Sequence, residues 1–201
     1  MIRVVFVIWI CLLTMTTGSA AQGPYIRGYF YTNEEGFVQN NKEAYKRFRL
    51  AAEKGNADGQ YNLGVMYRDG QGVAQDFKEA VKWYRLAANQ GNDNAQFDLG
   101  AMYDKGQDVQ DYKEAVKWYR LAAKQGNDNA QFNLGIMYRD GKGVPQDFIY
   151  SYMWMNIASA NGYSFGENYR DTLAGEMTQQ QIENAQELAN KCMSTNYKDC
   201  D

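Results

Sequence analysis

The chain has 201 residues, with 21 basic and 24 acidic side chains and no histidine, so its formal net charge is −3 at pH 7. The acidic balance argues against general nucleic-acid binding, which needs clustered basic side chains. The lack of histidine excludes Ser-His triads, Cys-His dyads and histidine metal sites. An apolar share of 45% is ordinary for a folded protein, and the presence of only two prolines favours helix.

Residues 1–21 have the layout of a secretory signal peptide. Arg3 is their only charged residue, Val4–Leu13 is an apolar run, and Thr14–Ala21 is small and polar. A membrane anchor is the alternative, but this run is shorter than the roughly 20 residues that span a bilayer. We therefore expect a cleaved signal, and contact with the membrane only through that segment.

A six-residue block recurs three times along the chain. It stands at Asn62–Tyr67, again at Asp98–Tyr103 and again at Asn133–Tyr138, so the step is 36 residues and then 35. Self-similarity at this period is typical of a solenoid, in which each unit buries its apolar face against its neighbours. We therefore predict an all-α fold, an α/α superhelix of antiparallel helix pairs.

Each repeat is predicted to hold two antiparallel helices, named here helix A and helix B. In one repeat Asp93 with Gln96 begins helix A, and Asp111 with Glu114 begins helix B, both as capping boxes. Apolar residues then recur at helical spacing, and glycines end the helices. The predicted repeats are 22–56, 57–92, 93–127 and 128–163, of which the first is degenerate although Asn40 and Glu43 keep its capping box.

Residues 164–201 lose the repeat register and are predicted to form C-terminal capping helices and a tail. A helix at about Phe165–Ala174 precedes one opened by the capping box Thr178–Gln181. Cys192 and Cys200 remain after signal removal, and an even count in an exported chain suggests a disulfide. A continuous helix would separate them by roughly 12 Å, so the helix must end between them if they bond. Two free thiols on a loose tail are the alternative.

Residues that recur in every repeat are interpreted as packing. One glycine in each helix A predicts that helix B approaches closely there, through equally small alanines. One methionine and one tryptophan in each repeat are predicted to lie in the core between the helices. The tryptophans could instead form a platform for a sugar or peptide. The rows are Gly64, Gly100 and Gly135 with Ala87, Ala122 and Ala158; Met66, Met102 and Met137; and Trp83, Trp118 and Trp154.

A basic ridge is predicted along the outer surface of the B helices. It could meet anionic lipid headgroups or an acidic partner, and a solvated face partly neutralised by Glu79 and Glu114 is the alternative. The ridge consists of Lys46, Arg49, Lys82, Arg85, Lys117 and Arg120.

The chain closely resembles the Sel-1-like repeat family, relatives of tetratricopeptide repeats, through the pattern A-x-x-x-L-G-x-x-Y-x-x-G-x-G-V-x-x-D-x-x-x-A-x-x-W-x-x-x-A-A-x-x-G. The resemblance is strong over 57–163 and weak over 22–56. It implies a right-handed superhelix with a concave groove. It also implies a bacterial protein, periplasmic or secreted, with a role in envelope signalling, host interaction or complex assembly.

The last repeat departs from this pattern on helix B. The charged helix B surface of the other repeats is replaced there by a surface of Ile149, Tyr150, Tyr152 and Met153. We expect this apolar surface to pack under the C-terminal helices.

Another protein is the predicted partner, bound on the concave face by helix A residues outside the packing pattern. These are Gln60, Asn62, Arg68, Gln96, Asp98, Asp104, Gln131, Asn133 and Arg139. The sequence shows no phosphate-binding loop and no dinucleotide fingerprint, so we expect no cofactor, no metal site and no catalytic residue. The alternative is a cell-wall or β-lactam-acting enzyme, as suggested for some cysteine-rich relatives, although Ser-x-x-Lys and Lys-Thr-Gly motifs are both absent.

Overall fold

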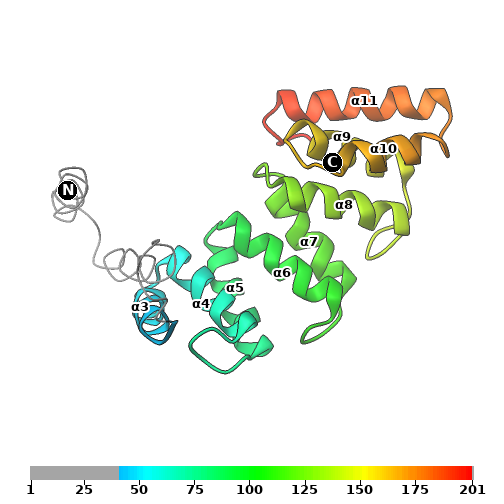
Figure 1. The fold of residues 1–201 in the computed structure, drawn as a ribbon. Helices are drawn as coiled ribbons and strands as arrows, with labels where there is room; N and C mark the ends of the chain where they lie inside the picture. Colours follow the sequence, from blue (N-terminus) through cyan, green and yellow to red (C-terminus); the bar gives the residue numbers. More distant parts are fainter. Residues whose placement is uncertain (1–40, 201) are drawn as a thin grey trace, which may run out of the picture. The chain divides into compact units, whose positions relative to one another are not determined.

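The computed structural model describes residues 41–200 (Figure 1). Within that range all regular structure is helical, which confirms the predicted all-α class. The predicted signal peptide, and most of the degenerate first repeat with its cap residue Asn40, lie outside the described residues. The chain divides into two compact units between Asn92 and Asp93, and each unit is described by itself.

Unit 1 contains three described helices, α3 (Asn41–Glu53), α4 (Ala57–Asp69) and α5 (Phe77–Asn89). Helix α4 packs against both α3 and α5, so it is the A helix of a repeat whose B helix is α5. An apolar core between α3 and α4 includes Phe48 and Leu63.

Unit 2 contains two complete helix pairs followed by two further helices. The elements are α6 (Asp93–Lys105), α7 (Tyr112–Ala123), α8 (Asp128–Asp140), α9 (Phe148–Ala160), α10 (Gly166–Ala174) and α11 (Gln179–Ser194). Helices α10 and α11 both pack against α9, which confirms the predicted capping pair (Figure 1). Across residues 41–200, no helix has both the length and the apolar content required for a bilayer span.

The B helices begin at the predicted aspartates but without the predicted capping boxes, since the backbone amides of Asp76 and Asp111 donate to the carbonyls of Tyr67 and Tyr103. The A helices do not begin at the predicted residues. Asp76 and Asp111 each accept hydrogen bonds from two backbone amides of the first turn, and Thr178 with Gln181 forms a full capping box. Helix α8, however, is capped by Asn127, whose side chain accepts from the amide of Ala130. Asp128 and Asp93 therefore lie inside their helices, where an acidic residue still interacts favourably with the helix N-terminus.

The helix A glycines permit a close approach, but to aromatic rings rather than to alanines. A Cβ built on Gly64 would lie 2.6 Å from the ring of Tyr84. In the last repeat the neighbour of Gly135 is Met155 instead of a tyrosine. The prediction that the alanine row faces these glycines is therefore wrong, because a flat ring needs the space that the missing side chain leaves.

The methionine row is core as predicted, since Met66, Met102 and Met137 are all buried. Trp118 and Trp154 are buried as well, and Trp83 packs against the core of unit 1. The tryptophans therefore do not form an exposed platform.

The apolar surface of the last B helix has two different neighbours. Tyr152 packs with Leu173 of α10 and Ala185 of α11, as predicted, and Met153 is buried. Tyr150 instead stacks on Tyr138 of α8, with ring centroids 5.3 Å apart. The expectation of packing under the C-terminal helices is therefore confirmed for Tyr152 and corrected for Tyr150.

Candidate functional site

Three of the nine predicted partner-binding residues are buried inside the protein. Gln60, Gln96 and Gln131 are only 5%, 4% and 0% exposed. In unit 1 the amide of Gln60 donates to the carbonyl of Ala52 at the end of α3 (3.3 Å) and accepts from Gln90 after α5 (2.7 Å). This glutamine therefore joins its own repeat to the preceding B helix.

The same arrangement occurs in unit 2. Gln131 donates to the carbonyl of Ala123 (3.1 Å) and accepts from Asn161 (2.8 Å), while Gln96 accepts from Gln125 (2.8 Å). A buried amide must have its hydrogen bonds satisfied within the protein, and these contacts supply them. The prediction that the three glutamines face a partner is therefore wrong.

A sequence signal for this burial was present. The glutamine is the same residue in all three repeats, just as the core glycine and methionine are. Positions used to recognise a specific partner are free to differ between repeats, whereas positions that hold the stack together are not.

The other six predicted residues lie on the A helices at two equivalent positions, and all of them are partly exposed. The first position holds Asn62, Asp98 and Asn133, and the second holds Arg68, Asp104 and Arg139. We name these six residues, of which two belong to unit 1 and four to unit 2, the helix A surface. Its charge changes from one repeat to the next, because only the middle repeat is acidic at both positions.

The two arginines of the helix A surface form ion pairs with the next residue along the chain. The Nε atom of Arg68 lies 2.7 Å from Asp69, and that of Arg139 lies 2.8 Å from Asp140. Arg139 also lies over the ring of Tyr169 in α10, at 5.8 Å. Hydrogen bonding to Arg139 lowers the pKa of Asp140, so this pair keeps its charges at neutral pH.

In unit 2 the acidic part of the helix A surface meets a buried tyrosine. The hydroxyl of Tyr119, on α7, interacts with Asp104 of α6 and with Asn133 of α8. Burial raises the pKa of Tyr119 far above its usual value, and Asp104 and Asp98 raise it further, so the hydroxyl stays protonated. Burial also raises the pKa of Asp104. Tyr119 thus interacts with one helix A residue from each of two consecutive repeats.

The predicted basic ridge is largely paired within its own helices. Lys46 and Arg49 lie 3.7 Å and 2.8 Å from glutamates of α3, and Lys82 and Lys117 lie 3.1 Å and 3.2 Å from Glu79 and Glu114. Arg120 points toward α8 and donates to the hydroxyl of Tyr138 (2.7 Å). Ion pairs within each helix therefore neutralise most of the positive charge of the ridge.

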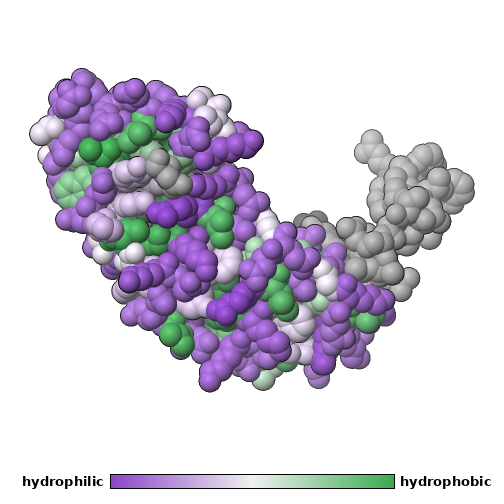
Figure 2. Space-filling view, turned by 180° about the vertical axis from the view of Figure 1, so that it is seen from behind, coloured by the Kyte–Doolittle hydropathy of each residue, from purple (hydrophilic) through white to green (hydrophobic). Residues whose placement is uncertain are grey.

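Polar side chains cover most of the face seen in Figure 2, and hydrophobic ones form separate patches on it. The large apolar side chains exposed among residues 41–200 are Leu50, Leu86, Val109, Leu121, Phe165 and Tyr169. Within the same range no group of three or more His, Cys, Asp or Glu side chains could hold a metal ion.

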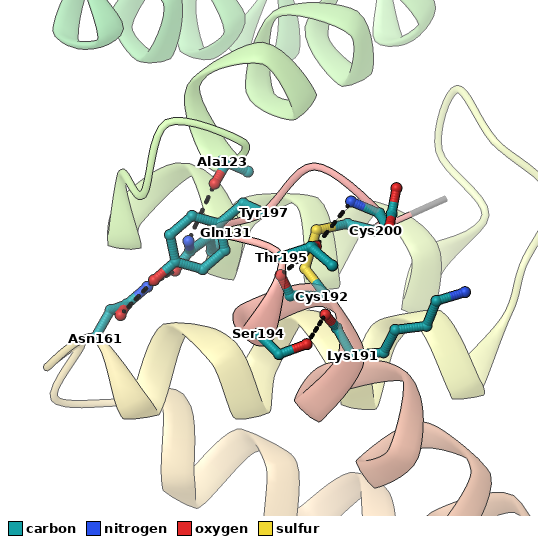
Figure 3. The surroundings of a disulfide bond; sticks show 10 residues. Ala123, Gln131, Asn161, Lys191, Cys192, Ser194, Thr195, Tyr197 and Cys200 are labelled. Carbon is teal, nitrogen blue, oxygen red and sulfur yellow. Dashed lines mark hydrogen bonds between the residues drawn. A yellow bond between two sulfur atoms is a disulfide. The ribbon is translucent and has the colours of Figure 1, made fainter.

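Cys192 and Cys200 form a disulfide in the structure, with Cα atoms 4.7 Å apart (Figure 3). Helix α11 ends at Ser194, and Asn196 and Tyr197 adopt positive φ values of 53° and 63°, which turns the chain back. The helix therefore ends between the two cysteines, as a bond between them requires.

Known proteins share this repeat pattern. A scan against protein-family models matched the Sel1 repeat at residues 25–56, 57–92, 93–127 and 128–163, which together exceed half of the chain. A search of curated proteins found none that matches.

Two solved structures are similar to this chain. One is a Sel1 repeat protein from Oxalobacter formigenes, 32% identical, with a TM-score of 0.70 over 79% of this chain and 67% of that one. The other is c5321, a protective antigen present in uropathogenic Escherichia coli strains and displaying an SLR fold, 27% identical, with a TM-score of 0.56 over 88% of this chain. Only 47% of c5321 is covered, so this chain spans about half its length.

The resemblance seen in the sequence is thereby confirmed by both comparisons. Sel1 repeats are generally non-catalytic scaffolds that bind other proteins. The chain, with its four matched repeats and its stacked helix pairs, belongs to the Sel1 repeat family.

Proposed function

We propose that this protein is an exported, non-enzymatic scaffold that binds another protein through its helix A surface. The observation that carries the proposal is the variation of this surface among equivalent positions. The second position reads Arg68, Asp104 and Arg139, while the buried glutamine, glycine and methionine beside it stay constant. A framework that stays constant and a partly exposed surface that varies suit recognition of one particular partner.

Two features support export to the periplasm or beyond. Residues 1–21 read as a signal peptide, and the C-terminal disulfide is of a kind that persists in oxidising compartments. The likeness to c5321, described as a protective antigen, fits a role in the bacterial envelope or in host interaction.

Charge reversal on the helix A surface tests the proposal. In cells expressing the full chain, Arg68→Glu and Arg139→Glu should together abolish crosslinking to the native partner, because both variants invert the charge offered to it. Lys82→Glu, on helix B, is the matched control and should leave crosslinking unchanged. Equal crosslinking by the native chain and both variant proteins, with unchanged circular dichroism, would show that the partner binds elsewhere.

A further inference from the structure

The residue before the turn glycine that follows each B helix has the same position and the same role in three repeats. Its side-chain amide donates to the buried glutamine of helix A in the same repeat, at 2.7 Å, 2.8 Å and 2.8 Å. The glycine after it always has a positive φ, of 90°, 92° and 100°. The three pairs are Gln90–Gly91, Gln125–Gly126 and Asn161–Gly162.

The change from glutamine to asparagine in the last repeat alters the chemistry of this position. The backbone nitrogen of Gly162 can attack the side-chain Cγ of Asn161 and close a five-membered succinimide. The new N–Cγ bond replaces the Cγ–Nδ2 bond, and ammonia leaves with the proton lost from the Gly162 amide. Water then opens the ring to aspartate or isoaspartate. A glutamine would need a six-membered ring, which closes far more slowly, and glycine adds no side chain to hinder the attack.

In the folded protein, hydrogen bonds restrain both groups that take part in this reaction, the Gly162 amide and the Asn161 side chain. The amide of Gly162, which would be the nucleophile, donates to the carbonyl of Ser159 at 3.0 Å. The Nδ2 of Asn161 donates to Gln131 at 2.8 Å, and its Oδ1 accepts from the hydroxyl of Tyr197 at 2.9 Å (Figure 3). With its side chain fixed at both ends, Asn161 cannot swing toward the Gly162 nitrogen.

The disulfide holds the last of these contacts in place. Tyr197 lies between Cys192 and Cys200, which are 0% and 3% exposed. Its ring also lies beside Gly126, where a Cβ would be 3.4 Å from the Cε2 atom. Within the same turn, Thr195 donates to the carbonyl of Cys192 and accepts from the amide of Asp199. Opening the disulfide therefore releases the segment that carries the Tyr197 hydroxyl.

We propose that Asn161–Gly162 is a deamidation site that the disulfide-bonded tail protects. A dithiol reductant opens the Cys192–Cys200 bond by thiol–disulfide exchange, leaving two cysteine thiols and the oxidised reductant as its own disulfide. This frees the side chain of Asn161, and deamidation of Asn161 then keeps the tail from returning to its place. The product places a carboxylate where Asn161 donated to Gln131, so two acceptors face each other. It also adds a negative charge at the C-terminus of α9, where the helix dipole disfavours it. This inference is independent of the proposed protein partner.

The test follows the formation of aspartate and isoaspartate at position 161 by peptide-mapping mass spectrometry of the folded full chain at mildly alkaline pH. Tyr197→Phe removes only the hydroxyl, and it should speed deamidation of Asn161 by roughly two- to tenfold, the factor expected for one hydrogen bond. The double variant Cys192→Ser/Cys200→Ser should speed it more, and the same chain in denaturant sets the upper limit.

Two controls make the result specific. Tyr152→Phe removes a hydroxyl that pairs with Gln186 of α11, away from Asn161, and should not change the rate. Asn161→Gln restores the residue type of the other repeats and should abolish modification while keeping the helix end. The proposal is overturned if both tail variants deamidate no faster than the native chain, or if Asn161 stays unmodified in the double variant.

Discussion

Gly100 of α6 lies against the ring of Tyr119 of α7, so closely that a Cβ on Gly100 would stand 2.8 Å from the ring carbon Cδ1. The equivalent glycine of the last repeat, Gly135, would meet the flexible Cγ of Met155 at 3.0 Å. The same position of helix A should therefore tolerate an added methyl group differently in these two repeats.

The Gly100→Ala variant should lower the free energy of unfolding by up to about 2 kcal/mol. Alanine gains about 1 kcal/mol of helix propensity, but overpacking against the ring of Tyr119 costs roughly 1–3 kcal/mol. Gly135→Ala should cost less than Gly100→Ala, since the Met155 side chain can shift and only the carbonyl of Ser151, 3.2 Å from the added Cβ, is fixed. Denaturant unfolding of both variants measures this difference, and an equal loss in the two would show that the ring does not set the requirement for glycine.

The buried glutamines give a second test of stability. Gln131→Met should cost roughly 1–3 kcal/mol, because it leaves the amide of Asn161 without its acceptor and removes one of the two donors to the carbonyl of Ala123, which keeps only the amide of Gly126. Gln146→Met is the matched control, since its amide bonds the carbonyl of Arg139 at the exposed surface (2.7 Å). It should cost less than about 1 kcal/mol. If thermal unfolding shows that the two variants lose similar amounts of stability, the burial of the Gln131 hydrogen bonds does not raise their contribution.

Two aspartates of unit 2 should respond to pH in opposite ways. Burial raises the pKa of Asp104, so the folded state loses stability relative to the unfolded state as pH rises through that pKa. Asp104→Asn removes this loss, and it should raise the free energy of unfolding at neutral pH but not in acid.

Asp140 is the internal comparison, because its hydrogen bond from Arg139 lowers its pKa. Its contribution is present above the unfolded pKa and disappears as pH falls through the folded one. Asp140→Asn should therefore destabilise the protein at neutral pH and have no effect in acid. Unfolding of both variants across the acid range checks the signs, and parallel pH profiles would contradict the assignment of the two shifts.

Local features of this fold were predictable from the sequence, and contacts between helices were less so. The caps at Asp76 and Asp111 and the methionine core depend on residues within a few positions of one another, where helix geometry fixes the outcome. The partner of Gly64 could not be chosen this way. Tyr84 and Ala87 lie three positions apart on one helix and share a face, and only the packed structure shows which of them meets the glycine.

The candidate site shows the same difference between local features and contacts that form only between helices. The variable residues Arg68, Asp104 and Arg139, which are partly exposed, were predictable from the sequence. The burial of Gln131 was not predicted, because within one helix nothing marks a polar side chain as buried, and only its identity across the repeats does so. Its hydrogen bonds run to Ala123 and Asn161, at the ends of the preceding and following helices, and this geometry exists only in the stack.

Site-specific photo-crosslinking tests the central claim most directly. A photoreactive residue is placed in the full chain, in separate variants, at Arg68, Asp104 or Arg139 on the A helices, and at Lys82 or Lys117 on the B helices. The account predicts that the helix A positions crosslink one and the same protein in the native envelope, and that the helix B positions do not. Crosslinks to that protein from Lys82 and Lys117, with none from the A helices, would contradict it.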